Sequence, residues 1–246
     1  DIDYLNKNNI ALAITGKSNA VSVAEHVMTM MLSLSKNIFA SDKLTRNNGF
    51  HKKAELPDFS ELYQKKIVIL GFGRIGRALA QRCLGFEMEV YVHDPYIKPE
   101  VIRQKNCIVT SLESGFRLAD YISIHLPLND NTKNLISHNE FKLFKKNLIL
   151  INTARGGIIN EEALYESLIN KNIHSAGLDV YEKEPPEVDN KLFNLDNILL
   201  TPHNSALTIE CRKRMSVESC ENVAYYLKNK NILNKNNIIN LSKIKS

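Results

Sequence analysis

The stretch that decides the fold is residues 66–76, with the sequence KIVILGFGRIG. Residues 67–70 form a continuous apolar run, which predicts a strand covered on both of its faces. The next six residues, 71–76, have the spacing G-x-G-x-x-G and lead into a helical pattern over residues 75–84. A glycine-rich turn between a buried strand and a helix is typical of sites that bind the phosphates of a dinucleotide.

Each glycine of this turn has its own physical reason. Gly71 permits the tight turn, Gly73 lets the backbone approach a pyrophosphate, and Gly76 allows close packing of the helix on the strand. The amides of Arg74 and Ile75 are then expected at the helix N-terminus, where partial positive charge favours phosphate. These five residues are our candidates for the pyrophosphate site.

An acidic residue ends the next predicted strand. Asp94 follows the apolar segment 89–93, about 20 residues after the glycine turn, as a ribose-binding acid should. Its carboxylate is expected to accept hydrogen bonds from ribose hydroxyls and to repel a 2′-phosphate. No arginine follows in residues 95–97, so NAD is favoured over NADP. A glycine turn with a strand-end aspartate cap is the weaker alternative, because four features coincide at the right spacing.

Around this unit, strands alternate with helices. Further strands are expected at 89–93, 121–125, 147–152, 174–178 and 198–201, and helices at 100–104, 111–119, 139–145 and 160–171. This alternation predicts an α/β fold with a doubly wound parallel sheet. The flanking segments are expected to form a short helix and a strand (10–14), one long core-facing helix (21–40), an irregular loop (45–64) and a closing helix (205–228).

Composition bounds the class of protein. The chain has 246 residues, of which 43% are hydrophobic and 24% charged, so collagen-like, low-complexity and disordered classes are excluded. No window of 18 uncharged apolar residues occurs, and no transmembrane helix is expected. The net charge of +5 concentrates in a Lys/Asn-rich tail. A nucleic-acid or membrane surface is the less favoured alternative to a solvated tail, so we expect neither partner.

The cysteines indicate a reducing compartment. Cys83, Cys107, Cys211 and Cys220 form neither a CxxC pair nor a zinc pattern, and no His/Asp/Glu cluster has metal-ligand spacing. We therefore expect free thiols, no metal site and a cytoplasmic location.

Three polar segments each follow a predicted strand. They are residues 152–157 (NTARGG) with Arg155, 179–186 (DVYEKEPP) with Glu184, and 201–206 (TPHNSA) with His203. The carboxyl ends of the strands in a doubly wound sheet face one ligand crevice. The three side chains are therefore expected at one edge of the sheet.

These residue types together suit a 2-hydroxy or 2-oxo acid. The guanidinium of Arg155 matches a carboxylate and a neighbouring oxygen bidentately. His203 is suited to give or take a proton as a hydride moves, and a carboxylate such as Glu184 holds the imidazole tautomer. Taken singly, each has a plainer alternative: a loop arginine, a solvated turn carboxylate and a capped structural histidine.

The chain resembles the NAD-dependent D-2-hydroxyacid dehydrogenases, a family that includes phosphoglycerate dehydrogenases, hydroxypyruvate and glyoxylate reductases and D-lactate dehydrogenases. The resemblance runs from Asp1 to Ala224 and rests on six segments: 19–26 (NAVSVAEH), 71–76, 125–128 (HLPL), 152–157, 177–184 and Pro202-His203. It implies a Rossmann-type NAD-binding domain and an oxidoreductase that transfers a hydride between NAD(H) and a D-2-hydroxy acid.

The same resemblance implies residue roles. Arg155 is expected to bind substrate at the edge of the cofactor, His203 to be the acid/base, and Glu184 to support it. Asp179 is expected to bind the nicotinamide amide. Three more residues are expected to line the cofactor cleft: Leu126, Thr153 and Ala154.

The resemblance also divides the chain. Residues 1–18 resemble the end of a substrate domain, most of which is absent from this sequence, so we expect a remnant of that domain and a chain that is a fragment. Residues 19–206 are the expected dinucleotide-binding domain. Residues 207–246 are expected to form a closing helix and a tail that return to the substrate domain.

Two other functions stay open: an NAD-sensing binding module of the co-repressor type, and an inactive, truncated cofactor-binding piece. The retained Arg155, Glu184 and His203 favour the enzyme over the sensor. Proteins that this chain resembles pair through the region of residues 22–40 and 45–64, so a homodimer is expected. His26, in that region, is interpreted as a packing or interface residue and not a catalytic one.

Overall fold

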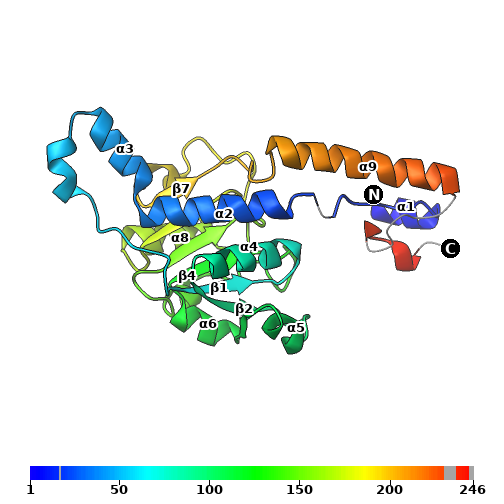
Figure 1. Cartoon of the computed structure of the whole chain (residues 1–246), viewed down its shortest axis with the longest axis horizontal. Coiled ribbons are helices and arrows are strands. Elements are labelled where there is room, and N and C mark those ends of the chain that lie inside the picture. The colour runs from blue at the N-terminus through cyan, green and yellow to red at the C-terminus, as the bar shows by residue number, and fades with distance from the viewer. Residues whose placement is uncertain (17, 230–236, 244–246) are drawn as a thin grey trace. The chain divides into compact units, whose positions relative to one another are not determined.

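The computed structural model describes residues 1–16, 18–229 and 237–243 (Figure 1). The chain divides into two compact units. The larger unit is Val23–Ser205, and the smaller one combines Asp1–Ser22 with Ala206–Ser246. The strands and the predicted site residues all belong to the larger unit.

The larger unit is built on a seven-stranded parallel sheet. The strands are β1 (Lys66–Leu70), β2 (Glu89–His93), β3 (Ile108–Val109), β4 (Tyr121–Ile124), β5 (Ile149–Asn152), β6 (Ser175–Leu178) and β7 (Ile198–Leu200). Their order in the sheet is β3-β2-β1-β4-β5-β6-β7. The chain thus builds outward first on one side of β1 and then on the other, which confirms the predicted doubly wound α/β fold.

Helices cover both faces of this sheet (Figure 1). The described helices that lie wholly or mostly in the larger unit, whether or not they cover the sheet, are α2 (Ala20–Ser35), α3 (Ile38–Arg46), η1 (Phe50–Glu55), α4 (Arg74–Gly85), α5 (Pro99–Arg103), α6 (Leu112–Leu118), α7 (His138–Phe141), α8 (Glu161–Ile169) and η2 (Lys191–Asn194). Ile67 and Ile69 of β1 share one core with α2 and α4, whereas Val68 and Leu70 share the other with α6, α7 and α8. Because β1 is buried on both faces, its sequence is apolar without alternation.

The strand register brings five loops to one edge of the sheet. Leu70 pairs with Ile124, and Ile124 pairs with Asn152. Asn152 in turn pairs with Leu178, and Leu178 with Leu200. The last residues of β1, β4, β5, β6 and β7 therefore form one row, and the loops that follow them leave the sheet together.

The single helix predicted over residues 21–40 is wrong beyond Ser35. Asn37 has a left-handed backbone with φ 45°, which ends one helix, and α3 begins directly after it. Asparagine tolerates this conformation better than other residues with a side chain. The segment 45–64, predicted to be irregular, contains the end of α3 and the short helix η1.

Three further elements differ from prediction. The strand expected over residues 10–14 is only a single bridge, between Ala13 and Ile238. The helix expected over residues 139–145 is the single turn α7. The two-residue strand β3 is absent from the prediction, because so short an edge strand has no periodicity of its own.

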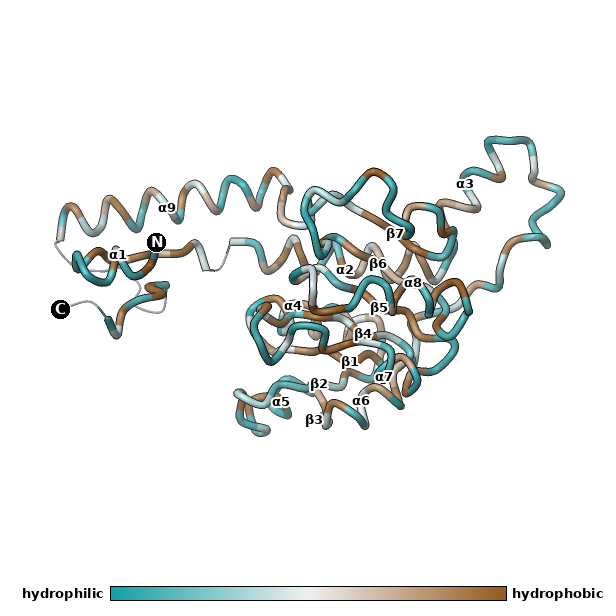
Figure 2. Tube along the Cα trace, turned by 180° about the vertical axis from the view of Figure 1, so that it is seen from behind, coloured by the Kyte–Doolittle hydropathy of each residue, from teal (hydrophilic) through white to brown (hydrophobic). Residues whose placement is uncertain are grey.

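The smaller unit contains α1 (Ile2–Lys7), α9 (Ile209–Asn229) and η4 (Leu241–Lys243). Arg214 of α9 donates to the Ser18 carbonyl oxygen at 3.0 Å, and Ser18 Oγ donates to Glu218 of α9 at 2.5 Å. The Asn240 side chain donates to the Ile10 carbonyl oxygen at 2.9 Å. Apolar residues recur along α9 (Figure 2), and several are exposed: Ile209, Val217, Val223, Tyr226 and Leu227.

Candidate active site

The glycine turn between β1 and α4 has the space that a dinucleotide needs. Gly71 has φ +95°, and a Cβ there would lie 2.5 Å from the His125 carbonyl oxygen. A Cβ on Gly76 would lie 2.1 Å from the Gly71 carbonyl oxygen. A Cβ on Gly73 would meet no heavy atom within 4 Å. The turn is thus closely packed at both ends and open in the middle, where α4 begins at Arg74, and this shape fits the pyrophosphate of NAD.

Asp94 follows β2 and reaches back to the glycine turn. Its Oδ2 accepts a hydrogen bond from the Phe72 amide at 2.8 Å, and its Oδ1 accepts one from the Tyr96 amide at 2.9 Å. The carboxylate is therefore held in a fixed orientation beside the turn, at the position predicted for a ribose-binding acid.

The loop after β5 carries three of the predicted residues. Asn152 shapes this loop, because its Oδ1 accepts from the Ala154 amide at 3.0 Å and its Nδ2 donates to the Arg155 carbonyl oxygen at 2.9 Å. Thr153 Oγ1 is buried and has no hydrogen-bond partner among the described residues. An orphaned buried hydroxyl calls for a ligand or water to satisfy it. A Cβ on Gly71 would lie 3.1 Å from Leu126 Cδ2, so Leu126 borders the glycine turn.

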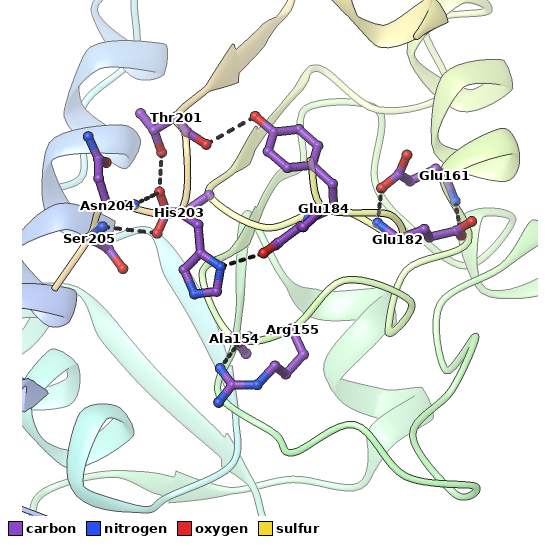
Figure 3. Close-up of polar contacts among 11 residues, drawn as sticks. Ala154, Arg155, Glu161, Glu182, Glu184, Thr201, His203, Asn204 and Ser205 are labelled. Carbon is purple, nitrogen blue, oxygen red and sulfur yellow. Dashed lines mark hydrogen bonds and ion pairs between the residues drawn. The ribbon is translucent and has the colours of Figure 1, made fainter. Parts of the chain in front are cut away.

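Glu184 and His203 form the central pair of the site. Glu184 Oε2 lies 2.7 Å from His203 Nδ1, and Glu184 Oε1 accepts from the Tyr181 amide at 3.1 Å (Figure 3). Burial raises the Glu184 pKa, but the hydrogen bonds from His203 and Tyr181 outweigh burial, so that this pKa lies below its usual value. Glu184 is thus ionised near neutral pH and can only accept, which makes His203 Nδ1 the donor.

The other ring nitrogen of this histidine is available. Among the described residues, His203 Nε2 has no hydrogen-bond partner, and the side chain is 49% exposed. His203 has φ +51°, a conformation in which histidine is tolerated but a β-branched residue is strained. The imidazole therefore has one nitrogen fixed by a carboxylate and the other accessible from solvent.

Arg155 lies in the neighbouring loop (Figure 3). Its side chain is exposed, and Nη1 donates to the Ala154 carbonyl oxygen at 2.6 Å. The next residue, Gly156, packs against the loop of Glu184 so closely that a Cβ would lie 1.7 Å from the Tyr181 carbonyl oxygen. The absence of a side chain at Gly156 thus lets the loops of Arg155 and Glu184 touch.

A reciprocal pair of glutamates, which the sequence does not reveal, fastens the Glu184 loop to α8. The Glu161 amide donates to Glu182 Oε1 at 2.9 Å, and the Glu182 amide donates to Glu161 Oε1 at 2.5 Å (Figure 3). Burial and then the charge of Glu182 raise the Glu161 pKa against the hydrogen bonds that lower it. This pair fixes the backbone two residues before Glu184.

Asp179 is fully buried and satisfied by donors from the loop after β7. Its Oδ1 accepts from Thr201 Oγ1 at 2.6 Å and from the Asn204 amide at 2.9 Å, and its Oδ2 accepts from the Ser205 amide at 3.0 Å (Figure 3). Burial raises the Asp179 pKa, but these hydrogen bonds outweigh it and the net pKa is lowered. Asp179 is therefore an ionised, precisely oriented acceptor.

His26 joins this group from α2. Its Nε2 lies 3.1 Å from Thr201 Oγ1 and 3.9 Å from Asp179 Oδ1. From the sequence, His26 is interpreted as a packing or interface residue, since helical periodicity does not show which distant loop a side chain meets. In the structure it lies beside Asp179, a predicted cofactor residue.

Residues 1–16, 18–229 and 237–243 contain no group of three or more His, Cys, Asp or Glu arranged to hold a metal ion. All four cysteines are unpaired. No described helix is both long and apolar enough to cross a membrane.

Comparison with known proteins supports a dehydrogenase. Residues 28–205 match the family model described as "D-isomer specific 2-hydroxyacid dehydrogenase, NAD binding domain". The chain is 36% identical to hydroxypyruvate reductase of Thermotoga maritima, covering 91% of this chain and 72% of that protein. It is 36% identical to D-3-phosphoglycerate dehydrogenase of Methanocaldococcus jannaschii, covering 97% of this chain but only 46% of that protein.

The fold is also similar to that of solved dehydrogenases. D-lactate dehydrogenase from Aquifex aeolicus, complexed with NAD and lactic acid, superposes with a TM-score of 0.87 at 30% identity. The match covers 97% of this chain and 76% of that one. These similarities confirm the predicted family, its Rossmann-type fold and its NAD-linked oxidoreductase class.

Proposed function

The chain belongs to the D-isomer specific 2-hydroxyacid dehydrogenases, and on that premise we propose that it interconverts a D-2-hydroxy acid and its 2-oxo acid with Arg155, Glu184 and His203 as its catalytic residues. NAD, when bound, supplies the hydride acceptor and its reduced form the donor. The observation that carries the proposal is the 2.7 Å contact between His203 Nδ1 and Glu184 Oε2. It leaves His203 Nε2 for the substrate oxygen.

The chain's own residues have distinct tasks in this proposal. Arg155 binds the substrate carboxylate and the neighbouring oxygen through two parallel hydrogen bonds. In the oxidation direction, His203 Nε2 takes the proton from the substrate hydroxyl, and in the reduction direction it returns that proton to the forming alkoxide. Glu184 keeps the Nδ1–H tautomer and stabilises the imidazolium.

The cofactor is assigned to the same edge of the sheet, beginning at the glycine turn after β1. The amides of the glycine turn with Gly71, Gly73, Arg74, Ile75 and Gly76 would hold the pyrophosphate, and Asp94 the adenosine ribose. Leu126, Thr153 and Ala154 would line the cleft, with Arg155 at its border and Asp179 at the nicotinamide amide. Support comes from the open space at Gly73 and from the orphaned hydroxyl of Thr153.

A substrate panel tests the proposed reaction. We expect the chain to oxidise NADH with at least one of glyoxylate, hydroxypyruvate, 3-phosphohydroxypyruvate or pyruvate, measured by NADH absorbance. His203→Ala should lower kcat by about 10²–10⁴-fold while NAD binding is retained, because a positioned acid/base contributes this much. His51→Ala, an exposed histidine of η1, is the matched control. NAD binding without turnover of any of these acids would contradict the proposal and favour a nucleotide-binding module.

We also propose that two copies associate through α3, η1 and the segment after them. Exposed apolar side chains on this part of the chain support the proposal: Ile38, Phe39, Phe50 and Phe59. Burying exposed apolar side chains is a common reason for association. A monomer in light scattering at micromolar concentration would contradict it, and Phe39→Glu with Phe50→Glu should convert a dimer to a monomer.

Domain assignment and location follow as further proposals. We assign residues 19–206 to the dinucleotide-binding domain, and residues 1–18 and 207–246 to a substrate domain. The division of the chain into two compact units supports this assignment. The four unpaired cysteines support a cytoplasmic location.

A further inference from the structure

His26 lies at the end of a hydrogen-bonded chain that leads to Asp179. The Thr201 hydroxyl donates to Asp179 Oδ1 at 2.6 Å, since an ionised carboxylate can only accept. A hydroxyl has a single hydrogen, so at its 3.1 Å contact with His26 Nε2 the Thr201 oxygen must be the acceptor. The proton of His26 is therefore on Nε2, and the order of donation is His26 to Thr201 to Asp179.

The surroundings of His26 favour this tautomer. Burial lowers the His26 pKa, and the charge of Asp179 opposes that effect without cancelling it. The ring is thus neutral near pH 7, with one proton to donate. Its side chain is 21% exposed, so most of it is shielded from competing water.

Several donors hold the Asp179 carboxylate at once. Oδ1 accepts from the Thr201 hydroxyl and the Asn204 amide, and Oδ2 accepts from the Ser205 amide. The Ser205 side chain also hydrogen-bonds this carboxylate, which is fully buried. The direction of the carboxylate therefore depends on how firmly Thr201 and these neighbours hold it.

We propose that His26 is a positioning residue for the nicotinamide end of the cofactor, acting through the Thr201 hydroxyl on Asp179. This inference rests on the proposed function, in which Asp179 accepts from the nicotinamide amide. His26 fixes the rotation of the Thr201 hydroxyl, which would otherwise turn freely among acceptors. A hydroxyl that already points at Oδ1 keeps the Asp179 carboxylate oriented before the cofactor binds, and such preorganisation lowers the cost of binding.

Calorimetric titration of the full chain with NAD and with ADP-ribose tests this role. ADP-ribose lacks the nicotinamide, so a merely structural change at His26 moves both affinities, whereas the proposed role moves only one. His26→Leu should raise the Kd for NAD about 3- to 10-fold, the effect of one ordinary hydrogen bond. The Kd for ADP-ribose should change by less than about 2-fold.

Two variants distinguish an effect of the His26 side chain from a general effect on α2. His26→Gln keeps an N–H donor and should retain NAD affinity to within about 2-fold. Thr29→Leu, at an exposed polar position on the same helix, is the matched control and should change neither affinity. Since His26 acts through Thr201, adding His26→Leu to Thr201→Val should weaken NAD binding no further than Thr201→Val alone.

Failure of this inference is distinguishable from failure of the proposed function. Asp179→Asn keeps the shape but replaces an acceptor oxygen by a donor, and should weaken NAD binding and spare ADP-ribose. If Asp179→Asn does so while His26→Leu leaves NAD unchanged, or weakens both ligands equally, the positioning role is overturned and the Asp179 assignment stands. If Asp179→Asn affects neither ligand, the assignment of Asp179 to the nicotinamide is itself wrong.

Discussion

Mild acid should destabilise the larger unit through His125. This residue follows β4 directly, and its Nε2 lies 2.9 Å from Ser123 Oγ. Its Nδ1 is buried and has no hydrogen-bond partner among the described residues. Burial lowers the pKa of His125 to about 3. An imidazolium at this position would bury a charge without a counterion, which is why the folded state resists the proton.

The direction of the effect follows from proton binding in the two states. In the unfolded chain a histidine has a pKa near about 6.5 and takes up a proton below that pH, whereas folded His125 stays neutral until about pH 3. The stability is thus fully present above the unfolded pKa and is lost progressively as the pH falls from there. Between about pH 7.5 and pH 5.0 this single site should remove about 2 kcal/mol of the free energy of unfolding.

Urea unfolding at several pH values measures this loss. The slope of the unfolding free energy against pH should be smaller in His125→Gln than in the parent, by nearly one proton below about pH 6. His51→Gln, which removes one exposed histidine of η1, is the control. Other buried groups titrate equally in all three proteins, so only the difference between slopes matters. If His125→Gln and the parent lose stability in parallel down to about pH 5, His125 is not excluded from protonation by the fold.

Three further outcomes are expected from the site. Gly73→Ala should leave the melting temperature nearly unchanged, because a Cβ there meets nothing within 4 Å, but should weaken NAD binding in calorimetry by about tenfold or more by obstructing the pyrophosphate. Asp94→Arg should narrow or reverse the preference for NAD over NADP in fluorescence titrations of both cofactors, and equal affinities of the parent would contradict the ribose assignment. Glu184→Gln keeps the shape of the side chain but removes the anion beside His203, so the acidic limb of the pH–rate profile for oxidation should move to lower pH. An unmoved profile would return Glu184 to the role of a solvated turn residue.

The sheet could be predicted because its determinants are local. The apolar run of β1 and the alternation of β2 are visible within five residues each, and the glycine turn specifies the geometry between strand and helix. Topology then follows from right-handed crossovers between parallel strands, which place the polar loops at one edge. The loops that carry Arg155, Glu184 and His203 could be placed at this edge for the same reason, as each loop follows a strand.

The features that escaped prediction arise from the backbone conformation of a single residue or from tertiary contacts. The end of α2 is decided by the left-handed conformation of Asn37, which leaves no trace in an apolar periodicity that continues past it. His26 meets Thr201 across 175 residues of sequence, and only the completed fold shows that a helix and a strand end share a hydrogen bond. The pairing of Glu161 with Glu182 is similar, since two acids 21 residues apart give no sign that each accepts the other's amide.

The loops after β5, β6 and β7 meet at Tyr181, a residue with no proposed chemical role. Its carbonyl oxygen packs against Gly156, its amide donates to Glu184, and its hydroxyl donates to the Thr201 carbonyl oxygen at 3.0 Å. Burial raises the Tyr181 pKa to about 12, so the hydroxyl keeps its proton and remains a donor throughout the pH range of any assay. The His203 amide donates to the same Thr201 carbonyl oxygen at 3.1 Å.

Tyr181 thus connects the three loops, through hydrogen bonds to Glu184 and Thr201 and through close packing against Gly156. Neighbouring groups that share partners in this way have free energies that do not add. The free-energy losses caused by single substitutions in the three loops should therefore not add. The distance between the His203 imidazole and the Glu184 carboxylate likewise depends on all three loops. The position of His203, our proposed acid/base, is thus set both by its contact with Glu184 and by this framework around Tyr181.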